Sequence, residues 1–131
     1  YYVADRSILF MKSIDCDIKS SSVLIMGLTF KENCPDTRNS KVFDIVDKFT
    51  KSGVETHVYD PWILSHDIDL AKNVSLVDFP NSNFYDCIIL AVAHDEFSKL
   101  GISKIRSFGK KQSIIYDLKY MFSAEDTDLR L

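Results

Sequence analysis

Apolar and polar positions along the chain fall into blocks that predict strands and helices in alternation. Apolar segments at residues 23–26, 54–59, 74–77, 87–93 and 113–116 predict five strands. The segment 87–93 is the most apolar of the chain, and both it and 23–26 run without a polar interruption. Such runs are typical of strands that are buried on both faces of a parallel sheet.

A helix is predicted between the first two strands. Apolar residues from Val42 to Phe49 follow the i, i+3, i+4, i+7 spacing of one helix face, and Gly53 ends the pattern. Asn39 and Ser40 are the candidates for its cap, because their side chains accept hydrogen bonds from the first free N–H groups of a helix.

Three further segments complete the secondary structure prediction. Residues 1–14 place apolar side chains three and four positions apart and predict a helix, while 95–100 and 103–108 predict two short helical pieces. The tail from Ser123 is polar, and we expect it to be loosely held.

The alternation of strands and helices predicts βαβ units, and therefore an α/β fold. We expect a three-layer, Rossmann-like parallel sheet with helices on both faces. The segment from Asp15 to Ser22 is polar and rich in serine, which indicates a linker. We therefore divide the chain into a helix with its linker, residues 1–20, and a single domain, residues 21–131.

Composition narrows the class of protein. The 131 residues are 46% hydrophobic and 27% charged, as expected for a soluble globular domain that needs no disulfide or metal to fold. The net charge of -3 argues against nucleic acid as a partner. The longest apolar run is too short to span a bilayer, so no membrane is expected.

The cysteines and the first residues add two expectations. Cys16, Cys34 and Cys87 are widely spaced, which argues against a disulfide framework or a zinc site and fits a reducing, cytoplasmic compartment. The chain opens on Tyr1 without an initiator Met, which we interpret as the mark of a piece of a longer protein.

Candidate chemistry lies after the strands, because open parallel sheets bind ligands beyond the C-terminal ends of their strands. The segment after the first strand carries two cations, Lys31 and Arg38, ahead of a helix N-terminus, an arrangement suited to phosphate. It contains no Gly-x-Gly-x-x-Gly and is about a dozen residues long. We therefore expect a Rossmann-type topology without a dinucleotide site of its own.

Other strand ends carry residues with two open interpretations. Asp60 is either an acceptor for ribose hydroxyls or the start of a turn. His94 either contacts an anion or shuttles a proton, or else it helps to cap the following helix or fills the loop. Lys119 is either a ligand contact or a surface lysine. Cys34 has basic neighbours but no histidine near in sequence, so we expect it to be non-catalytic, and we expect Trp62 to be a packing anchor.

Five ordered blocks of sequence resemble the C-terminal domain of the UDP-glucose/GDP-mannose dehydrogenase family. The first is Gly27 to Val42, with the letters GLTFKENCPDTRNSKV, and the second is VYDP at 58–61. AVAHDEF at 91–97, IYDLK at 115–119 and DLRL at 128–131 are similar to the branch that acts on UDP-N-acetylhexosamines. Tyr2-Val3-Ala4 resembles the end of a long helix that precedes this domain in the family.

The resemblance implies a function. Enzymes of this family oxidise the C6 hydroxyl of a nucleotide sugar to a carboxylate with two NAD+, and such uronic acids are precursors of surface polysaccharides. The resemblance implies that Phe30, Lys31 and Lys119 bind the UDP-sugar and that Arg38 reaches the NAD pyrophosphate. Many relatives carry an arginine at the place of Lys119, and lysine lacks its bidentate fork.

The same resemblance implies that this chain alone is inactive. The family's catalytic cysteine belongs to an upstream segment that this sequence does not contain. Its N-terminal domain binds NAD, its central region pairs the subunits, and the parent is expected to be a homo-oligomer. Two other classes remain open from the residues alone: a receiver-like signalling domain, and a non-catalytic interaction module of Rossmann-like fold.

Overall fold

The computed structural model describes residues 2–14, 16–29, 31–37, 40–63 and 74–130. The elements in chain order are α1 (Tyr2–Ser13), η1 (Ile18–Ser20), β1 (Ser22–Met26), α2 (Val42–Lys51), β2 (Glu55–Tyr59), β3 (Val74–Leu76), β4 (Tyr85–Leu90), α3 (Asp95–Phe108), β5 (Gly109–Asp117), η3 (Ala124–Asp126) and β6 (Leu129–Arg130). Among the described residues, no helix is long and apolar enough to cross a membrane.

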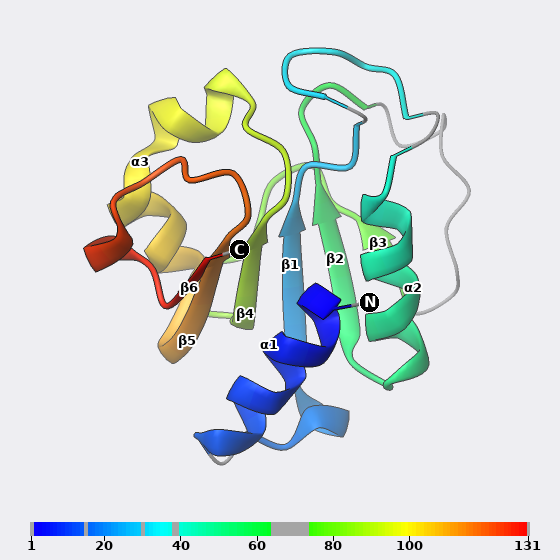
Figure 1. Ribbon diagram of the computed structural model, residues 1–131, viewed down its shortest axis with the longest axis vertical. Coiled ribbons are helices and arrows are strands. Elements are labelled where there is room, and N and C mark those ends of the chain that lie inside the picture. Colours follow the sequence, from blue (N-terminus) through cyan, green and yellow to red (C-terminus); the bar gives the residue numbers. More distant parts are fainter. Residues whose placement is uncertain (1, 15, 30, 38–39, 64–73, 131) are drawn as a thin grey trace.

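The six strands form one sheet in the order β3-β2-β1-β4-β5-β6, and every neighbouring pair is parallel. This is the order of the dinucleotide-binding fold, and it differs from the 2-1-3-4-5 order of receiver domains. The direction of winding reverses between β1 and β4, which makes that pair the topological switch point of the sheet (Figure 1). The sequence therefore predicts the Rossmann-like fold correctly, and the strand order argues against a receiver.

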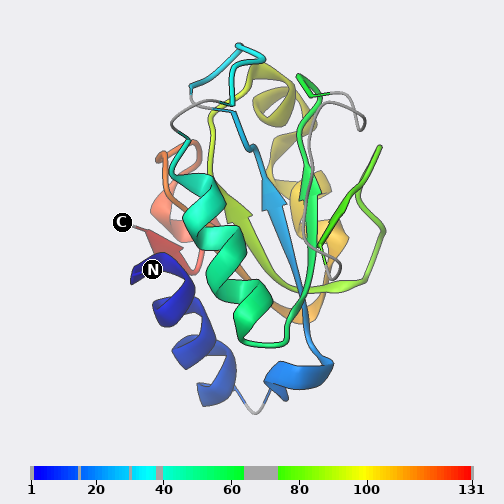
Figure 2. The same cartoon turned by 90° about the vertical axis from the view of Figure 1, so that its right-hand side faces the viewer.

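Helices cover both faces of this sheet, in three layers (Figures 1 and 2). Val23 and Ile25 of β1 face α1 and α2, and Leu24 and Met26 face α3, because successive side chains of a strand point to opposite faces. All five residues of β1 are buried, as the uninterrupted apolar run predicts. The two core layers consequently hold the C-terminal ends of the strands in fixed positions.

A glycine allows β1 and β4 to approach closely at the switch point. Gly27 has φ of 102°, and a Cβ atom at this position would lie 2.5 Å from the Cβ of Val92. The N–H groups of Ala91 and Val92 both donate to the Met26 carbonyl. This convergence ends the regular ladder at Leu90, so β4 is shorter at its end than the predicted 87–93.

The predicted helices are confirmed. α2 spans the expected stripe, although its cap is Lys41 and the hydroxyl of Ser40 accepts from the N–H of Val42 at 3.3 Å. The two predicted pieces of α3 are separated at Gly101, whose φ of 80° breaks the helix. Asn39, the other candidate cap, lies outside the described residues.

The prediction of a loose tail is wrong. Strand β6 pairs with β5, and the carboxylate of Asp128 accepts from the N–H of Ile115 at 2.8 Å. Arg106 of α3 pairs with the same carboxylate at 3.1 Å. The polar composition of this segment is explained in part by these partners, since the carboxylate of Asp128 binds to the domain.

The N-terminal helix packs on the domain. Val3, Ala4 and Met11 of α1 are buried in the same core layer as α2. The 3-10 helix η1 and the start of β1 occupy the predicted linker. The division at residue 20 stays a prediction.

Candidate functional site

Four candidate residues of the sequence analysis follow strands at the C-terminal edge of the sheet: Lys31, Asp60, His94 and Lys119. We call residues 27–41 the β1 loop and residues 118–122 the β5 loop. Asp60 follows β2 and His94 follows β4, on the two strands that flank β1 (Figure 1). The predicted position of the site at this edge therefore brings Asp60, His94 and the β1 loop together.

Asp60 is the centre of a buried hydrogen-bond network. Its Oδ2 accepts from the N–H groups of Leu28 and Thr29, at 2.8 and 3.2 Å, and lies 3.0 Å from Nε2 of His94. Its Oδ1 accepts from the N–H of Trp62 at 2.8 Å. The carboxylate thus forms the local turn expected of an Asp-Pro pair and also anchors the β1 loop.

The network shifts the acidity of Asp60. Burial opposes ionisation of the carboxyl, but hydrogen bonds from His94 and from the N–H groups of Leu28 and Trp62 outweigh it, and they hold the pKa of Asp60 below its ordinary value. Asp60 is therefore a buried anion whose acceptor capacity is used within the protein. It is not placed to accept from a ribose.

The ring of His94 is completely buried, and both of its nitrogens are engaged. Nδ1 accepts from the N–H of Asn33 at 2.9 Å, so the ring proton lies on Nε2. Nε2–H then donates to Asp60 and lies 3.1 Å from the hydroxyl oxygen of Thr29. His94 therefore fills the space under the β1 loop and forms hydrogen bonds within the protein. Neither nitrogen is left to contact an anionic ligand.

Asn33 connects the β1 loop to helix α3. It adopts φ of 56°, in the left-handed region that asparagine tolerates better than most residues. Its Oδ1 accepts from the N–H of Asp95, in the first turn of α3, at 3.0 Å. One side chain thereby fixes the position of the loop and occupies a free donor of the helix.

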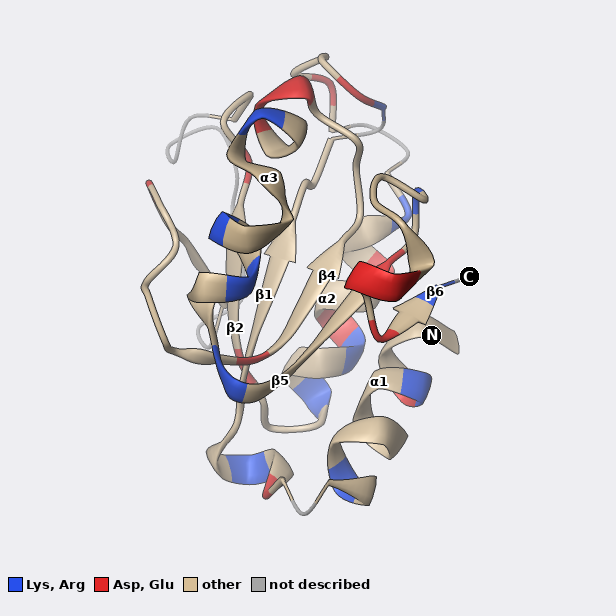
Figure 3. Cartoon of the chain, turned by 90° about the vertical axis from the view of Figure 1, so that its left-hand side faces the viewer, with Lys and Arg blue, Asp and Glu red and all other residues tan. Residues whose placement is uncertain are grey.

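The N-terminus of α3 is not available to a phosphate. Two acidic residues, Asp95 and Glu96, occupy its first turn, which is coloured red in Figure 3. The N–H of Asp95 is already bonded to Asn33. Dinucleotide-binding folds set the pyrophosphate on a free helix N-terminus. The N-terminus of α3 therefore offers no free site for a pyrophosphate.

Lys31 lies on the anchored part of the β1 loop. Its side chain is exposed, and its carbonyl accepts from the hydroxyl of Thr29 at 3.0 Å. Phe30 and Arg38, the other candidates on this loop, lie outside the described residues. The structure thus presents one cation at the switch point, on a backbone that the network holds.

Lys119 lies after β5 on a second anchored loop. The buried carboxylate of Asp117 accepts from the N–H groups of Lys119, Met121 and Phe122, at 3.0 to 3.2 Å. The side chain of Lys119 is exposed. Strand β4 lies between β1 and β5, and no described hydrogen bond or ion pair joins Lys31 to Lys119.

Two of the three cysteines are unsuited to nucleophilic chemistry. Burial raises the pKa of Cys87 to about 12. Burial and the negative charge of Asp86 raise the pKa of Cys16. Cys34 is half-buried in the β1 loop. Within the described ranges, no group of three or more His, Cys, Asp or Glu residues is placed to hold a metal ion.

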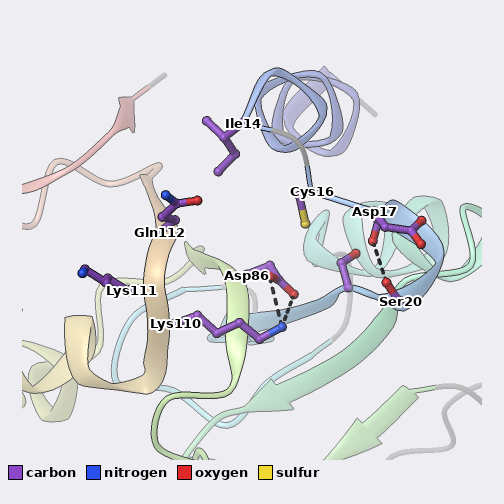
Figure 4. A pocket seen from close by; sticks show the side chains of 9 residues that line it. Ile14, Cys16, Asp17, Ser20, Asp86, Lys110, Lys111 and Gln112 are labelled. Carbon is purple, nitrogen blue, oxygen red and sulfur yellow. Dashed lines mark hydrogen bonds and ion pairs between the residues drawn. The ribbon is translucent and has the colours of Figure 1, made fainter.

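A cavity of about 380 Å³ lies at the opposite edge of the sheet (Figure 4). The carboxylate of Asp86 accepts there from the N–H of Ser22 at 2.9 Å and pairs with Nζ of Lys110 at 3.1 Å. This edge holds the N-terminal ends of the strands, where open parallel sheets do not bind ligands. We therefore place the candidate site at the other edge.

Sequence reasoning missed the roles of Thr29 and Asn33. Each bonds to His94, more than 60 positions away in sequence. Asn33 lies in a loop, and asparagine tolerates the left-handed region better than most residues. The sequence gives no indication, however, that His94 is its partner. Trp62, expected to be a packing anchor, is instead partly exposed at 37%: its ring centroid lies 6.2 Å from that of His94, and its Nε1–H donates to Glu96 at 3.2 Å.

Comparison with known sequences gives consistent matches. A sequence profile for the UDP-glucose/GDP-mannose dehydrogenase family, UDP binding domain, matches residues 24–124. The chain is 42% identical over 130 residues to UDP-N-acetyl-D-glucosamine 6-dehydrogenase of Pseudomonas aeruginosa, which covers 99% of this chain and 31% of that protein. It is 40% identical over 130 residues to the protein of the same description from Salmonella typhi, with the same coverage. The chain thus spans 31% of the length of these curated relatives.

Solved structures share the fold. The UDP-N-acetyl-mannosamine dehydrogenase Cap5O from S. aureus superposes with a TM-score of 0.71 at 23% identity, over 98% of this chain and 29% of that one. An NDP-N-acetyl-D-galactosaminuronic acid dehydrogenase from Methanosarcina mazei Go1 gives 0.73 at 18% identity, over 95% and 26%. At these identities the likeness concerns the fold alone.

Proposed function

The chain belongs to the UDP-glucose/GDP-mannose dehydrogenase family, and we propose that it forms the UDP-sugar-binding part of an NAD-dependent UDP-sugar 6-dehydrogenase. The complete enzyme would oxidise C6 of a UDP-sugar to a uronic acid for surface polysaccharide synthesis, in the cytoplasm. One observation carries the proposal: relatives at 42% and 40% identity over almost the whole chain are UDP-N-acetyl-D-glucosamine 6-dehydrogenases.

The geometry supports this role for the β1 loop. Lys31 is exposed at the switch point, where sheets of this order bind their ligands. Its loop is held by buried hydrogen bonds, so the cation needs little reordering when a diphosphate arrives. Under the proposal, Lys31, Phe30 and Lys119 bind the UDP-sugar.

Under the proposal, another part of the polypeptide binds the cofactor. NAD would be bound mainly by an N-terminal domain, with Arg38 reaching its pyrophosphate. The acidic first turn of α3, whose first N–H is already bonded to Asn33, supports this division. NAD would supply the hydride acceptor for both oxidations. This chain's part is to hold the nucleotide and to exclude water from it. We propose that the catalytic cysteine also lies upstream, and that the longer protein is a homo-oligomer.

Titration of the intact polypeptide with UDP, followed by calorimetry, tests the proposal. We expect Lys31→Ala and Lys119→Ala each to raise the Kd by about tenfold, because each removes a charge-assisted hydrogen bond to phosphate. Both side chains are exposed, so the free energy of unfolding should change by less than about 0.5 kcal/mol. Arg38→Ala should raise the KM for NAD and leave UDP affinity unchanged.

The matched control is Lys12→Ala, an exposed lysine in the last turn of α1. It removes the same charge from a different part of the surface and should leave the Kd unchanged. The proposal fails if the unaltered protein does not bind UDP, or if Lys12→Ala weakens binding as much as the other two lysine variants.

A further inference from the structure

We propose that His94 is the positioning residue of the UDP site: it sets the path of the β1 loop and thereby the affinity for the diphosphate, without touching the ligand. The inference rests on the proposed function. It assigns a role to a side chain that has no place in the chemistry itself, because its ring is completely buried.

His94 holds the β1 loop on both sides of Lys31. On one side, Nε2 lies 3.1 Å from the hydroxyl oxygen of Thr29. On the other, Nδ1 accepts from the N–H of Asn33 at 2.9 Å. The hydroxyl of Thr29 in turn donates to the carbonyl of Lys31 at 3.0 Å. One ring therefore fixes both ends of the short segment that carries the cation.

The hydrogen bonds around the ring are consistent with a single arrangement of protons. The N–H of Asn33 requires a lone pair on Nδ1, and the carboxylate of Asp60 requires a proton on Nε2. The hydroxyl of Thr29 gives its own proton to Lys31, so it can accept from Nε2–H. The neutral imidazole thus supplies an acceptor toward Asn33 and a donor toward Asp60 from one rigid ring.

The surroundings keep the ring in place and out of reach of a ligand. Phe97 packs edge-on against it with ring centroids 5.3 Å apart, and Trp62 lies 6.2 Å away. Asp60 receives three backbone N–H groups besides the ring, so it cannot turn away. His94 consequently acts on the ligand through the β1 loop alone.

The consequence is a preorganised loop. Asn33 adopts a left-handed conformation that is uncommon for residues other than glycine, and its N–H bond to His94 and its side-chain bond to Asp95 hold it there. Without the ring, the loop samples other paths, and part of the binding free energy is spent on ordering it. The loss should appear in KM and not in kcat, because the loop contacts the substrate and its transition state equally.

The test uses two substitutions of His94 in the intact polypeptide. His94→Gln keeps a donor toward Asp60 and removes the acceptor for Asn33, whereas His94→Asn keeps an amide oxygen near the place of Nδ1. We expect His94→Gln to raise the Kd for UDP and the KM for the UDP-sugar by about tenfold with kcat unchanged. His94→Asn keeps the acceptor for Asn33 but loses the contact to Thr29, so it should raise both values by a smaller factor. Exchange of the Asn33 amide should accelerate in His94→Gln and much less in His94→Asn.

Two further variants separate positioning from general stability. Ile105→Val truncates a buried residue of α3 beyond the break at Gly101, and should lower stability with no effect on UDP binding. Asn33→Ala removes the bond to Asp95 on an exposed residue, so it should fold and still weaken UDP binding.

The outcomes are distinguishable. If the unaltered protein binds UDP and His94→Gln binds it equally well, the positioning role is overturned and the proposed function stands. The same holds if Ile105→Val weakens binding as much as His94→Gln does. If the unaltered protein does not bind UDP at all, both proposals fail.

Discussion

Two buried aspartates, Asp60 and Asp117, end strands on opposite sides of the switch point, and they organise the backbone in different ways. Asp60 accepts from residues 31 and 32 positions away, on the β1 loop, and pairs with His94, 34 positions away. Among the described residues, Asp117 accepts from N–H groups two to five positions further along its own chain. One carboxylate joins three strand ends, and the other shapes a single loop.

This difference shows that the backbones of the two lysines of the proposed site, Lys31 and Lys119, are fixed by different kinds of hydrogen-bond network. The position of Lys31 depends on a long-range network that includes the buried ring of His94. A substitution of any residue in that network should therefore change the position of Lys31. The position of Lys119 depends on a local turn, because its acceptor, Asp117, is the last residue of β5. We therefore expect the two loops to respond to substitution separately, because they share no described hydrogen bond.

The largest expected effect is that of Asp60→Ala. It leaves the N–H groups of Leu28, Thr29 and Trp62 and the ring of His94 without their acceptor. We expect the free energy of unfolding to fall by about 3–5 kcal/mol, the range found when one partner of a buried polar pair is removed. Urea unfolding at neutral pH measures this loss, and a fall below about 1 kcal/mol would contradict a central role for Asp60.

Asp117→Ala should have a smaller and more confined effect. Its three N–H donors belong to a loop with an exposed residue, Lys119, where water can replace the carboxylate. We expect a loss of about 1–3 kcal/mol, with faster amide exchange at Lys119, Met121 and Phe122 and unchanged exchange in the β1 loop. Faster exchange at Leu28 or Asn33 would show that the two loops are coupled after all.

The smallest expected effect is the pH dependence of the contribution that Asp60 makes to the free energy of unfolding. The pKa of Asp60 is lower in the folded protein than its ordinary value of 3.8, so the folded state favours the carboxylate. This contribution is complete above pH 3.8 and is lost as the pH falls from there through the folded pKa. The stability difference between the unaltered protein and Asp60→Asn should therefore shrink in acid, as measured by urea unfolding from neutral pH downward.

The sequence predicts the layers of this fold better than its connections. The run at 23–26 and the stripe from Val42 to Phe49 identify buried faces, because burial leaves a periodic record in neighbouring residues. The tail was predicted wrongly because the partners of Asp128 are Ile115 and Arg106, which periodicity cannot reveal.

The candidate site shows the same limit. The sequence places Asp60, His94 and Lys119 at strand ends, since position after a strand is a local property. It does not reveal that His94 bonds to Thr29 and Asn33, because that contact depends on how two crossovers bring distant loops together. The alternative interpretations of Asp60 could be decided only once its long-range partners were known.

Within the part of the chain that the structure describes, the two outermost strands of the sheet are its shortest: β3 has three residues and β6 has two. An outer strand exposes a row of unpaired backbone groups, and a foreign strand can add to it when the row is long. Here each margin offers only a few such groups, which leaves little length for a second copy to align against. The described part of each margin should consequently be a poor template for strand addition by a second copy.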